Sequence, residues 1–429
     1  MLEDRKYREY MISQGYRLQR TCEGENIWRL CPALTSKRHS ETDETDVWKC
    51  CSTCKRTCGM NKVDVPGSSR IQAGDSLDSS SIIISGMDKD SSMYCLGSCS
   101  RADYGAIASL NKTCRSLVQS GELYRFRKNN GMIEHWIYIS CTHLQWEAFD
   151  PARGRWMQLP IMPSNEAYLF SDKESVAVGT ELLVFGKELM TNIIYRYSLL
   201  TNAWTTGMSM IAPRCLFGSA SIGEKAIIAG GCDARGYAIS SAELYNSETG
   251  IWQPLPKMNK PRKMCSAVFM EGKFYVIGGL TGVGHYSKVL TCGEEYNLDT
   301  ETWTVVPNMS PARVDGPRKN EAPPLVAVVD DELYAADHAR MELRKYDKER
   351  RDWVTLGRLP EHAGSMNGWG LAFRACGRRL ICIGGPRTSG QGFIEVNSWV
   401  PSEGGPPEWE MLDQKESLSF VYNCAVMGC

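Results

Sequence analysis

Three short runs, AIIAGGC (226–232), AELY (242–245) and WQPLP (252–256), contain the pattern that decides the fold of this chain. The first run is apolar and ends in two glycines, which predicts a buried strand and then a close approach of backbones. The second and third runs predict two more strands, and the turn NSETG (246–250) lies between them. The order is therefore strand, diglycine, strand, turn and a strand that carries tryptophan.

The spacing of the aromatic residues in this unit recurs along the chain. Seven residues separate Tyr245 from Trp252. Four other pairs have the same spacing: Phe149 and Trp156, Tyr197 and Trp204, Tyr296 and Trp303, and Tyr346 and Trp353. A further tryptophan, Trp409, follows less regularly. A period of roughly 50 residues is typical of the four-stranded blades of β-propellers.

The repeats predict six blades over residues 131–429. The first blade contains a strand at 135–140 but no strand before it that would be innermost. The apolar run 420–427 has no repeat after it. Pairing this run with 135–140 completes the first blade, closes the ring and removes two exposed sheet edges. We therefore predict an all-β, six-bladed propeller.

The repeated diglycine, tyrosine and tryptophan together resemble the kelch repeat. The resemblance implies that 131–429 form a kelch β-propeller, in which the aromatic residues build apolar contacts rather than a cofactor site. The histidines show no ligand spacing, and the chain has no nucleophile motif or phosphate-binding glycine loop. No catalytic residue and no cofactor are therefore predicted.

Length, composition and charge limit the possible partners. The chain has 429 residues, of which 42% are hydrophobic and 23% charged, as in ordinary soluble globular proteins. A formal net charge of -1 gives no reason to predict direct binding of nucleic acid. Neither a secretory signal nor a long apolar run is present, so no membrane span is predicted. We expect a nuclear or cytoplasmic protein with mostly free thiols.

Residues 1–81 are polar and end in a serine-rich tract, which predicts a disordered or weakly ordered leader and linker. Four cysteines lie close together in it: Cys50, Cys51, Cys54 and Cys58. Thiolates at short spacing bind Zn²⁺, but structural zinc sites usually draw their ligands from two separated pairs. The surrounding lysines and arginine equally fit a nuclear-localisation or phosphate-attracting patch. No metal site is predicted, and these cysteines are only weak candidates.

Residues 82–130 have a different character. Apolar residues three or four positions apart predict short amphipathic helices; they include Met93, Leu96, Ile107, Leu110, Cys114, Leu117 and Val118. Ser100 is placed to begin a helix and Gly121 to end one. The basic stretch 125–135 is interpreted as a solvated linker. A module of roughly 45 residues has a marginal core, so it should pack against the propeller or a partner.

Several segments of this module carry a resemblance: IISGM (83–87), Cys95 with Leu96, KTCRSL (112–117) and SGELY (120–124). They resemble the F-box of the plant F-box/kelch-repeat proteins. The resemblance implies that the module binds a Skp-type adaptor and, through it, a cullin. The implied contact residues are Ile84, Gly86, Met87, Leu96, Leu110, Cys114 and Leu117. The chain departs from the family pattern at Ser85, Met87 and Cys114, where the family has proline, leucine and tryptophan.

Loops that leave each tryptophan strand are the candidates for binding a target protein. Arginine recurs there after proline, and forked guanidinium donors suit carboxylates on a partner peptide. Alternatively, each arginine holds the backbone of its own loop. Long loops on a rigid scaffold often carry binding residues. The candidates are Arg214, Arg235, Tyr237, Arg262, His285, Tyr286, Arg313, Arg318 and Lys319.

Three functions are compatible with these features. The first is a non-catalytic substrate receptor of a Skp-cullin-F-box ubiquitin ligase, whose helical module binds the adaptor and whose propeller binds a target protein. The second is a kelch interaction scaffold whose degenerate F-box recruits no ligase. The third is a metal-dependent kelch enzyme, which predicts bound metal in the purified protein.

Overall fold

The computed structural model describes the backbone of residues 16–20 and 28–32 and, in full, 83–142, 145–164, 168–188, 191–282, 287–311, 321–363, 365, 367–385, 392–401, 405–417 and 419–429, except the side chains of 168–173. The chain divides into two units, 1–82 and 83–429. In the first unit, β1 (Tyr16–Arg20) pairs antiparallel with β2 (Trp28–Pro32). The sequence predicted a disordered or weakly ordered leader over 1–81, and this hairpin is the regular structure described within it.

The second unit begins with a helical module. Its elements are α2 (Lys89–Ser98), the 3₁₀ turn η1 (Arg101–Asp103), α3 (Tyr104–Leu110), α4 (Lys112–Gln119) and α5 (Glu122–Asn129). The predicted start at Ser100 is confirmed, since its hydroxyl accepts from the Ala102 amide. Gly121, with φ of 75°, separates α4 from α5. The interpretation of 125–135 as a solvated linker is wrong, because α5 extends through its first residues and buries Arg127.

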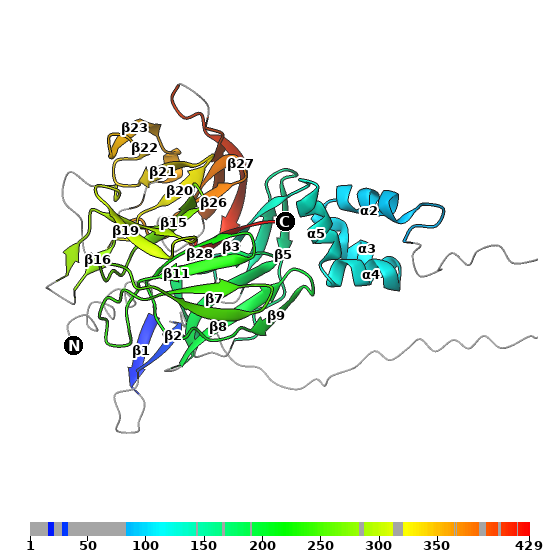
Figure 1. Ribbon diagram of the computed structural model, residues 1–429, viewed down its shortest axis with the longest axis horizontal. Helices are drawn as coiled ribbons and strands as arrows, with labels where there is room; N and C mark the ends of the chain where they lie inside the picture. The colour runs from blue at the N-terminus through cyan, green and yellow to red at the C-terminus, as the bar shows by residue number, and fades with distance from the viewer. Residues whose placement is uncertain are drawn as a thin grey trace, which may run out of the picture. The chain divides into compact units, whose positions relative to one another are not determined.

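Six four-stranded antiparallel sheets follow in the described part of the chain, and they are the predicted blades (Figure 1). Blade 1 consists of β28 (Asn423–Gly428), β3 (His135–Ser140), β4 (Glu147–Asp150) and β5 (Arg155–Gln158). Blade 2 consists of β6 (Tyr168–Val178), β7 (Glu181–Glu188), β8 (Thr191–Ser198) and β9 (Ala203–Thr206). Blade 3 consists of β10 (Gly218–Ile222), β11 (Lys225–Ala229), β12 (Ala242–Asn246) and β13 (Ile251–Leu255).

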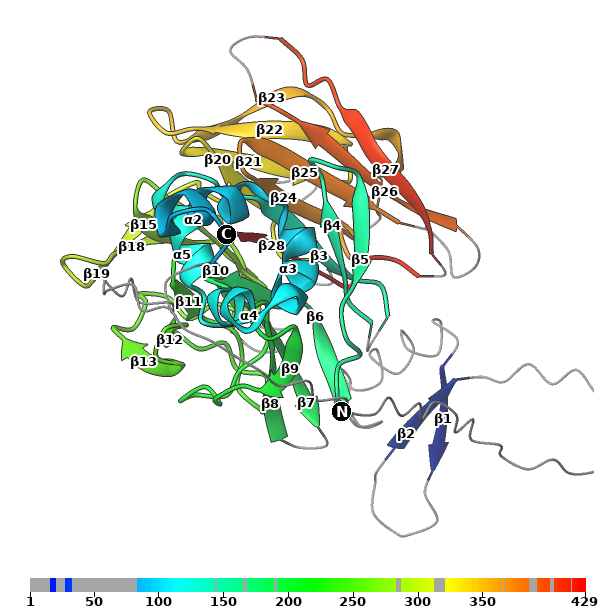
Figure 2. The same ribbon diagram turned by 90° about the vertical axis from the view of Figure 1, so that its right-hand side faces the viewer.

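Blade 4 consists of β14 (Ser266–Met270), β15 (Lys273–Ile277), β18 (Gly293–Asn297) and β19 (Thr302–Val306). Blade 5 consists of β20 (Val326–Val329), β21 (Glu332–Asp337), β22 (Glu342–Asp347) and β23 (Asp352–Arg358). Blade 6 consists of β24 (Ala372–Cys376), β25 (Arg379–Gly384), β26 (Gly392–Trp399) and β27 (Glu410–Ser417). Two short strands, β16 (Leu280–Thr281) and β17 (Lys288–Val289), form a hairpin in blade 4, and the 3₁₀ turn η3 (Glu361–Ala363) follows β23. Figure 2 shows the blades of the second half of the chain beside those of the first.

The C-terminal strand closes the ring. β28 pairs antiparallel with β3, with Met427 opposite Trp136 and Gly428 opposite His135. It is the innermost strand of blade 1, for which the residues directly before 135–140 supply no strand. Pairing the two ends of the propeller in one sheet leaves no open edge at the junction. The predicted closure by 420–427 is confirmed.

The repeated aromatic residues pack as facing pairs and also join neighbouring blades. Tyr245 lies opposite Trp252 on adjacent strands, and their ring centroids are 4.9 Å apart. The indole of Trp252 donates to the Met208 carbonyl of blade 2 at 2.9 Å. The indoles of Trp204, Trp303 and Trp409 donate in the same way to Pro160, Pro256 and Arg358 of the preceding blades. One residue type therefore supplies both core area and a bond between blades.

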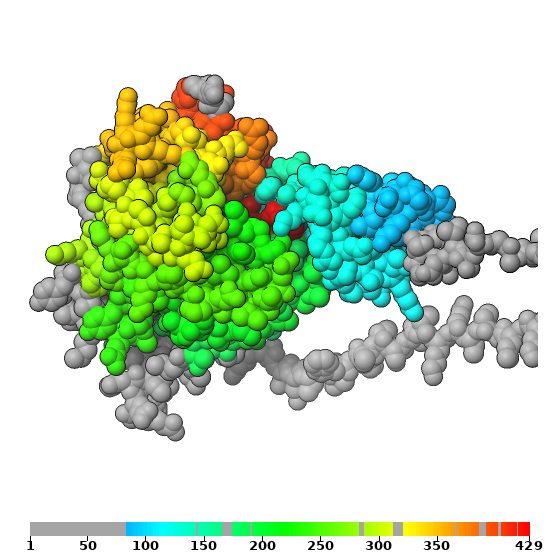
Figure 3. All heavy atoms as spheres, in the orientation of Figure 1, coloured from blue at the N-terminus to red at the C-terminus, as the bar shows by residue number. Residues whose placement is uncertain are grey.

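The helical module shares a hydrophobic core with blades 1 and 2. Leu96, Leu117 and Tyr124 of the helices belong to the same buried cluster as Trp136 of blade 1 and Tyr197 of blade 2. Figure 3 shows the helical atoms, in blue and cyan, directly against the propeller. The small module therefore gains its core area from the propeller, as expected for its length.

Candidate interaction surfaces

The two ends of the propeller carry different segments of the chain. Turns between first and second strands lie at one end, and the helical module meets this end where it leads into β3 and where Lys128 bonds Glu224 in the β10–β11 turn at 3.0 Å. Connections between blades, and between second and third strands, lie at the opposite end because strands alternate in direction. We call these the helix end and the loop end.

Arg101 fastens the helical module to the helix end. Its guanidinium donates to the Tyr138 hydroxyl at 3.0 Å, the Cys429 sulfur at 3.0 Å and the Glu134 carbonyl at 3.1 Å. It also lies 4.6 Å from the centre of the Trp136 ring. Burial raises the pKa of Tyr138 to about 12, so the phenol stays neutral and accepts this bond. The contacts fix the module on the strands of blade 1.

A carboxylate completes this junction. Glu134 bonds the Arg101 backbone amide at 3.1 Å and lies 3.3 Å from Arg127 and 3.2 Å from Arg153. Partial burial acts to raise the pKa of Glu134, but the Arg101 amide bond and the charges of Arg127 and Arg153 outweigh it and hold the pKa below its usual range. The carboxylate is therefore charged where the helices join the propeller.

Glu134 should make the junction sensitive to acid. A carboxyl whose pKa is lower in the folded state stabilises that state above its unfolded pKa, about 4.3 for glutamate, and this stability disappears as pH falls through the folded pKa. We expect Glu134→Gln to lose less stability than the natural chain between about pH 6 and pH 3.5. Urea unfolding followed by tryptophan fluorescence measures this. Glu248→Gln, at an exposed carboxylate, is the control; equal pH dependence in Glu134→Gln and the natural chain would contradict the role of Glu134.

The predicted adaptor contacts divide into core and surface residues. Leu96, Cys114 and Leu117 are buried in the shared core, so their assignment to a surface open to an adaptor is wrong. The reason is geometric, because the apolar stripe of each helix faces the neighbouring helices and the propeller. Ile84 and Met87 are half-buried, and Gly86 is exposed with φ of 83°.

Leu110 is the clearest exposed apolar residue of the module, at 71% exposure, and Tyr94 follows at 50%. Leu110 is the last residue of α3, and the Asn111 side chain caps α4 directly after it by accepting from the Cys114 amide at 2.7 Å. We call Gly86, Met87, Tyr94 and Leu110 the helical surface. None of these four residues belongs to the buried core, so a partner contact there would require no rearrangement of the core.

At the loop end, two of the predicted arginines are internal. Arg262 is fully buried and lies 2.6 Å from Glu294, which is also fully buried. Its other donors bond the Gly278 carbonyl at 3.0 Å and the Cys292 carbonyl at 3.2 Å. Arg214 repeats the arrangement in blade 3 with Glu243 and the carbonyls of Gly230 and Ser241.

The hypothesis that Arg214 and Arg262 contact a target is therefore wrong, and the alternative that each holds its own loop is correct. Each arginine ties the connection between blades to the first glycine of the diglycine and to the third strand. The matching acid stands two residues before the repeated tyrosine, as Glu243 before Tyr245 and Glu294 before Tyr296. This second spacing is the signal in the sequence from which the internal pairing could have been predicted.

A groove opens at the loop end between blades 4 and 5. Its volume is about 220 Å³. Apolar residues dominate its lining, among them Leu280, Leu290, Pro324 and Leu325, and the charged or polar residues Glu321, Asp337 and His338 also line it. His338 Nδ1 is 2.8 Å from the Ser365 carbonyl, which holds the ring in place. The groove includes described residues of the connections 280–291 and 314–324, which hold the candidates His285 and Tyr286 and the candidates Arg318 and Lys319.

The other target candidates have different positions. Arg235 and Tyr237 are exposed on the β11–β12 connection, with Tyr237 at 52% exposure. The Lys263 amine reaches this connection by donating to the Gly236 carbonyl at 2.9 Å, and the Lys263 backbone pairs with Leu280 at the groove. The candidates outside the described residues are His285, Tyr286, Arg313, Arg318 and Lys319.

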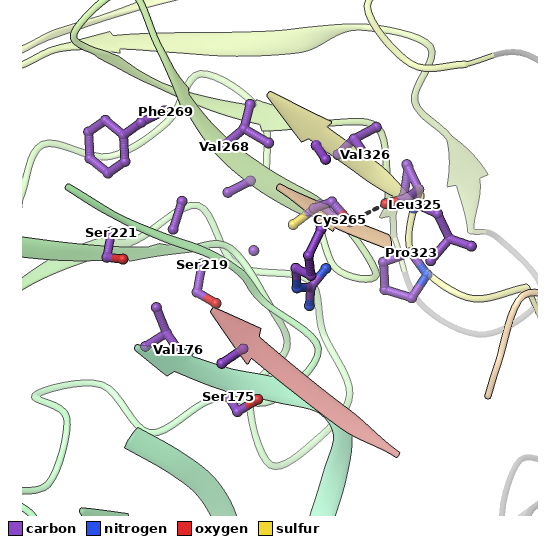
Figure 4. Close-up of a pocket in the computed structure, with 18 of the residues that line it drawn as sticks. Ser175, Val176, Ser219, Ser221, Cys265, Val268, Phe269, Pro323, Leu325 and Val326 are labelled. Carbon is purple, nitrogen blue, oxygen red and sulfur yellow. Dashed lines mark hydrogen bonds between the residues drawn. The ribbon is translucent and has the colours of Figure 1, made fainter. Parts of the chain in front are cut away.

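A second cavity, of about 250 Å³, runs between the innermost strands. In the view of Figure 4, Ser175, Ser219 and Ser221 lie on one side of it and Leu325 and Val326 on the other. Ser221 already donates to the Ala177 carbonyl at 2.5 Å. The lining mixes hydroxyls and apolar groups with the charged residues Glu174 and Arg374, and it indicates no particular ligand.

The side chains of the described residues form no metal centre. Across the described ranges, no group of three or more His, Cys, Asp or Glu side chains is placed to hold a metal ion. Cys50, Cys51, Cys54 and Cys58 lie outside those ranges. None of the described helices has the length and apolarity needed to span a membrane.

Comparison with known proteins agrees with this architecture. A family model described as the kelch motif matches residues 213–259 and 261–310, which are blades 3 and 4 with their arginine–glutamate pairs. The F-box/kelch-repeat protein SKIP11 of Arabidopsis thaliana is 64% identical over 362 residues, 83% of this chain and 77% of the relative. The F-box/kelch-repeat protein At1g26930 of the same plant is 59% identical over 381 residues, 86% of this chain and 89% of the relative. The resemblance seen in the sequence is confirmed, and the chain belongs to the F-box/kelch-repeat protein family.

Proposed function

We propose that this protein is the substrate-recognition subunit of a Skp-cullin-F-box ubiquitin ligase. The helical surface binds a Skp-type adaptor and, through it, a cullin, while the loop end of the propeller binds a target protein. The chain itself is not an enzyme and needs no cofactor, because other subunits transfer ubiquitin. We place this activity in the nucleus or the cytoplasm. The names of the Arabidopsis relatives, which pair an F-box with kelch repeats, support this proposal.

The observation that carries the proposal is the buried junction between the two parts. The helices share a core with blades 1 and 2, and Arg101 bonds the backbone and side chains of blade 1. A target bound at the loop end is thereby held at a set position relative to an adaptor bound at the helical surface. Holding two reactants together raises their effective concentration, which is the contribution a receptor makes to ubiquitin transfer.

The groove between blades 4 and 5 is our proposed target site. Its lining is mostly apolar and includes the polar groups of Asp337 and His338, so it fits an apolar side chain of an extended peptide. Tyr237 and Arg235 stand exposed on the neighbouring blade. Tyrosine and arginine are common at the centres of protein interfaces.

Leu110→Glu tests the adaptor surface directly. Because Leu110 is 71% exposed, the change leaves the core intact but places a charge in the proposed apolar contact. We expect co-purification with a Skp-type adaptor to fall at least about tenfold, the equivalent of about 1.4 kcal/mol. The readout is the amount of adaptor captured by the tagged full chain at equal protein concentration.

Ile161→Glu is the matched control, because Ile161 is 70% exposed on a propeller loop. It should capture adaptor as the natural chain does. Deletion of 82–124 is a poorer test, since it removes part of the core that blades 1 and 2 share. No capture of adaptor by the natural chain would sink the adaptor assignment and favour a kelch scaffold that recruits no ligase. Equal capture by Leu110→Glu and the natural chain would instead remove Leu110 from the adaptor contact.

A further inference from the structure

Two cysteines face each other at the loop end of blade 3. Cys215 lies in the connection from blade 2, and Cys232 follows the diglycine of blade 3. Their sulfur atoms are 3.5 Å apart. The Cys215 amide donates to the Cys232 carbonyl at 3.2 Å, and the Cys232 amide donates to the Cys215 carbonyl at 2.7 Å.

This backbone arrangement suits a disulfide. Residues that exchange both amide bonds across an antiparallel pair have Cα atoms about 5.5 Å apart, within the range of roughly 4.4–6.8 Å that disulfides span. The sulfur atoms need to approach by only roughly 1.5 Å to bond. No movement of the strands is required.

The backbone of the blade, rather than the cysteines themselves, places these two positions opposite each other. Blade 4 has the same isolated bridge between Lys263 and Leu280, again with both amide bonds, at 2.9 and 2.7 Å. Lys263 follows Arg262 as Cys215 follows Arg214, and Leu280 follows its diglycine as Cys232 does. The fold therefore places two side chains together here in both blades, and only blade 3 supplies two thiols.

The electrostatic surroundings of the pair also favour, at Cys232, the thiolate form that disulfide formation requires. The hydrogen bond between the two sulfurs lowers the pKa of Cys232 and raises that of Cys215, and the positive charges of Lys263 and Lys187 assist at Cys232 against its burial. Thiolates are the reactive form of cysteine. By contrast, burial raises the pKa of Cys265 to about 11 and that of Cys382 to about 12.

We propose that Cys215 and Cys232 form a reversible modification site, a dithiol that hydrogen peroxide converts to an intramolecular disulfide. The half-buried Cys215 side gives a small oxidant access to the pair. In reducing compartments, disulfides of this kind are usually transient and redox-sensing rather than structural. The site goes beyond the receptor function and does not depend on it.

The chemistry balances with peroxide as the oxidant. The Cys232 thiolate attacks one peroxide oxygen, the O–O bond breaks, and sulfenic acid and hydroxide form. The Cys215 sulfur then attacks the Cys232 sulfur, the S–O bond breaks, and the hydroxyl leaves with the Cys215 proton as water. The hydroxide takes up the proton that Cys232 released on becoming a thiolate. Both sulfurs are oxidised by one electron each, and one peroxide becomes two waters.

The disulfide would restrain the connection that carries Arg235 and Tyr237. This connection begins at Cys232, and Asp233 already folds it by accepting from the Arg235 and Tyr237 amides at 2.9 Å. A covalent link to Cys215 ties its start to the loop between blades 2 and 3. Oxidation therefore reaches one of the exposed surfaces at the loop end.

The test uses the full chain, treated with hydrogen peroxide, alkylated and digested for mass spectrometry. We expect a linked peptide pair joining Cys215 to Cys232, the loss of these two alkylation sites, and their return after dithiothreitol. Cys95→Ser, which removes an exposed thiol elsewhere, should keep the linkage. Cys215→Ser should lose it and leave a sulfenic acid at Cys232 that dimedone traps.

Three results would overturn the proposal. One is oxidation of the exposed Cys95 while Cys215 and Cys232 remain open to alkylation. Another is sulfinic or sulfonic acid at either cysteine without a linked peptide. The last is a disulfide in the natural chain that joins Cys215 or Cys232 to a third cysteine. This result does not depend on whether the variants fold.

Discussion

Replacing Arg262 with methionine is expected to lower the free energy of unfolding by about 3–5 kcal/mol, because it leaves a buried carboxylate without its cation. Glu294 is fully buried, and it would keep only the amide bonds from Asn259 and Lys260, at 2.7 and 3.0 Å, and the Asn259 side chain. The carbonyls of Gly278 and Cys292 would lose their donor as well. Chemical denaturation at neutral pH measures the loss.

Arg235→Met is the control for this change, because it removes an equally charged but exposed side chain of the same end of the propeller. Exposed substitutions usually change stability by less than about 0.5 kcal/mol. If Arg262→Met unfolds at the same denaturant concentration as Arg235→Met, Arg262 does not hold the connection between blades 3 and 4. A target-binding role for Arg262 would then have to be considered again.

Replacing Trp252 with alanine is expected to cost about 3–5 kcal/mol, the usual cost of removing a large aromatic side chain from a core. Trp252 is 5% exposed and packs on Tyr245 of its own blade and Phe185 of blade 2. The Met208 carbonyl would also lose the indole donor. Trp252→Phe keeps much of the area but not the hydrogen bond, so it should fall between alanine and the natural residue.

Tyr237→Ala provides the comparison at an exposed aromatic residue, since Tyr237 is 52% exposed. Thermal unfolding by calorimetry should show a lower midpoint for Trp252→Ala and almost none of this change for Tyr237→Ala. A midpoint that does not move in Trp252→Ala would remove this tryptophan from the bonds between blades.

The junction and the loop end respond to different changes. Acid acts on Glu134, between the helices and blade 1, whereas peroxide acts on Cys215 and Cys232 at the opposite end of the strands. Buried arginine networks connect loops to strands at the loop end and helices to strands at the helix end. Internal charges therefore hold the helical module and the loops in place, and the exposed residues beside them are the ones that we propose for binding.

The sequence predicted the propeller because the signals for it are local and repeated. Tyr245 and Trp252 stand on neighbouring strands joined by a short turn, so their spacing in the chain is also their pairing in space. The same spacing in four other blades, together with the less regular Trp409, indicated the number of repeats. Pairing of the strand at 135–140 with the apolar run at 420–427 was then predicted, because an open ring exposes two sheet edges.

The site residues were harder to predict, because the recurrence of Arg214 and Arg262 has the same appearance whether they bind a partner or a loop. Their partners, Glu243 and Glu294, lie 29 and 32 residues later in the sequence. Only the burial of both members of each pair distinguishes the two roles. Leu96, Cys114 and Leu117 were misassigned for a similar reason, since an apolar stripe does not show which surface covers it.

The sequence by itself determined the number of blades, the strand that closes the ring and the presence of a helical module, because these depend on local spacing and on satisfying sheet edges. Tertiary structure decided which charges are internal, how the helices share a core with blades 1 and 2, and that Cys215 meets Cys232. These features depend on the approach of segments that belong to different strands and blades. Burial and the distances between segments far apart in the sequence are defined only once the backbone is folded, so the sequence alone did not reveal them.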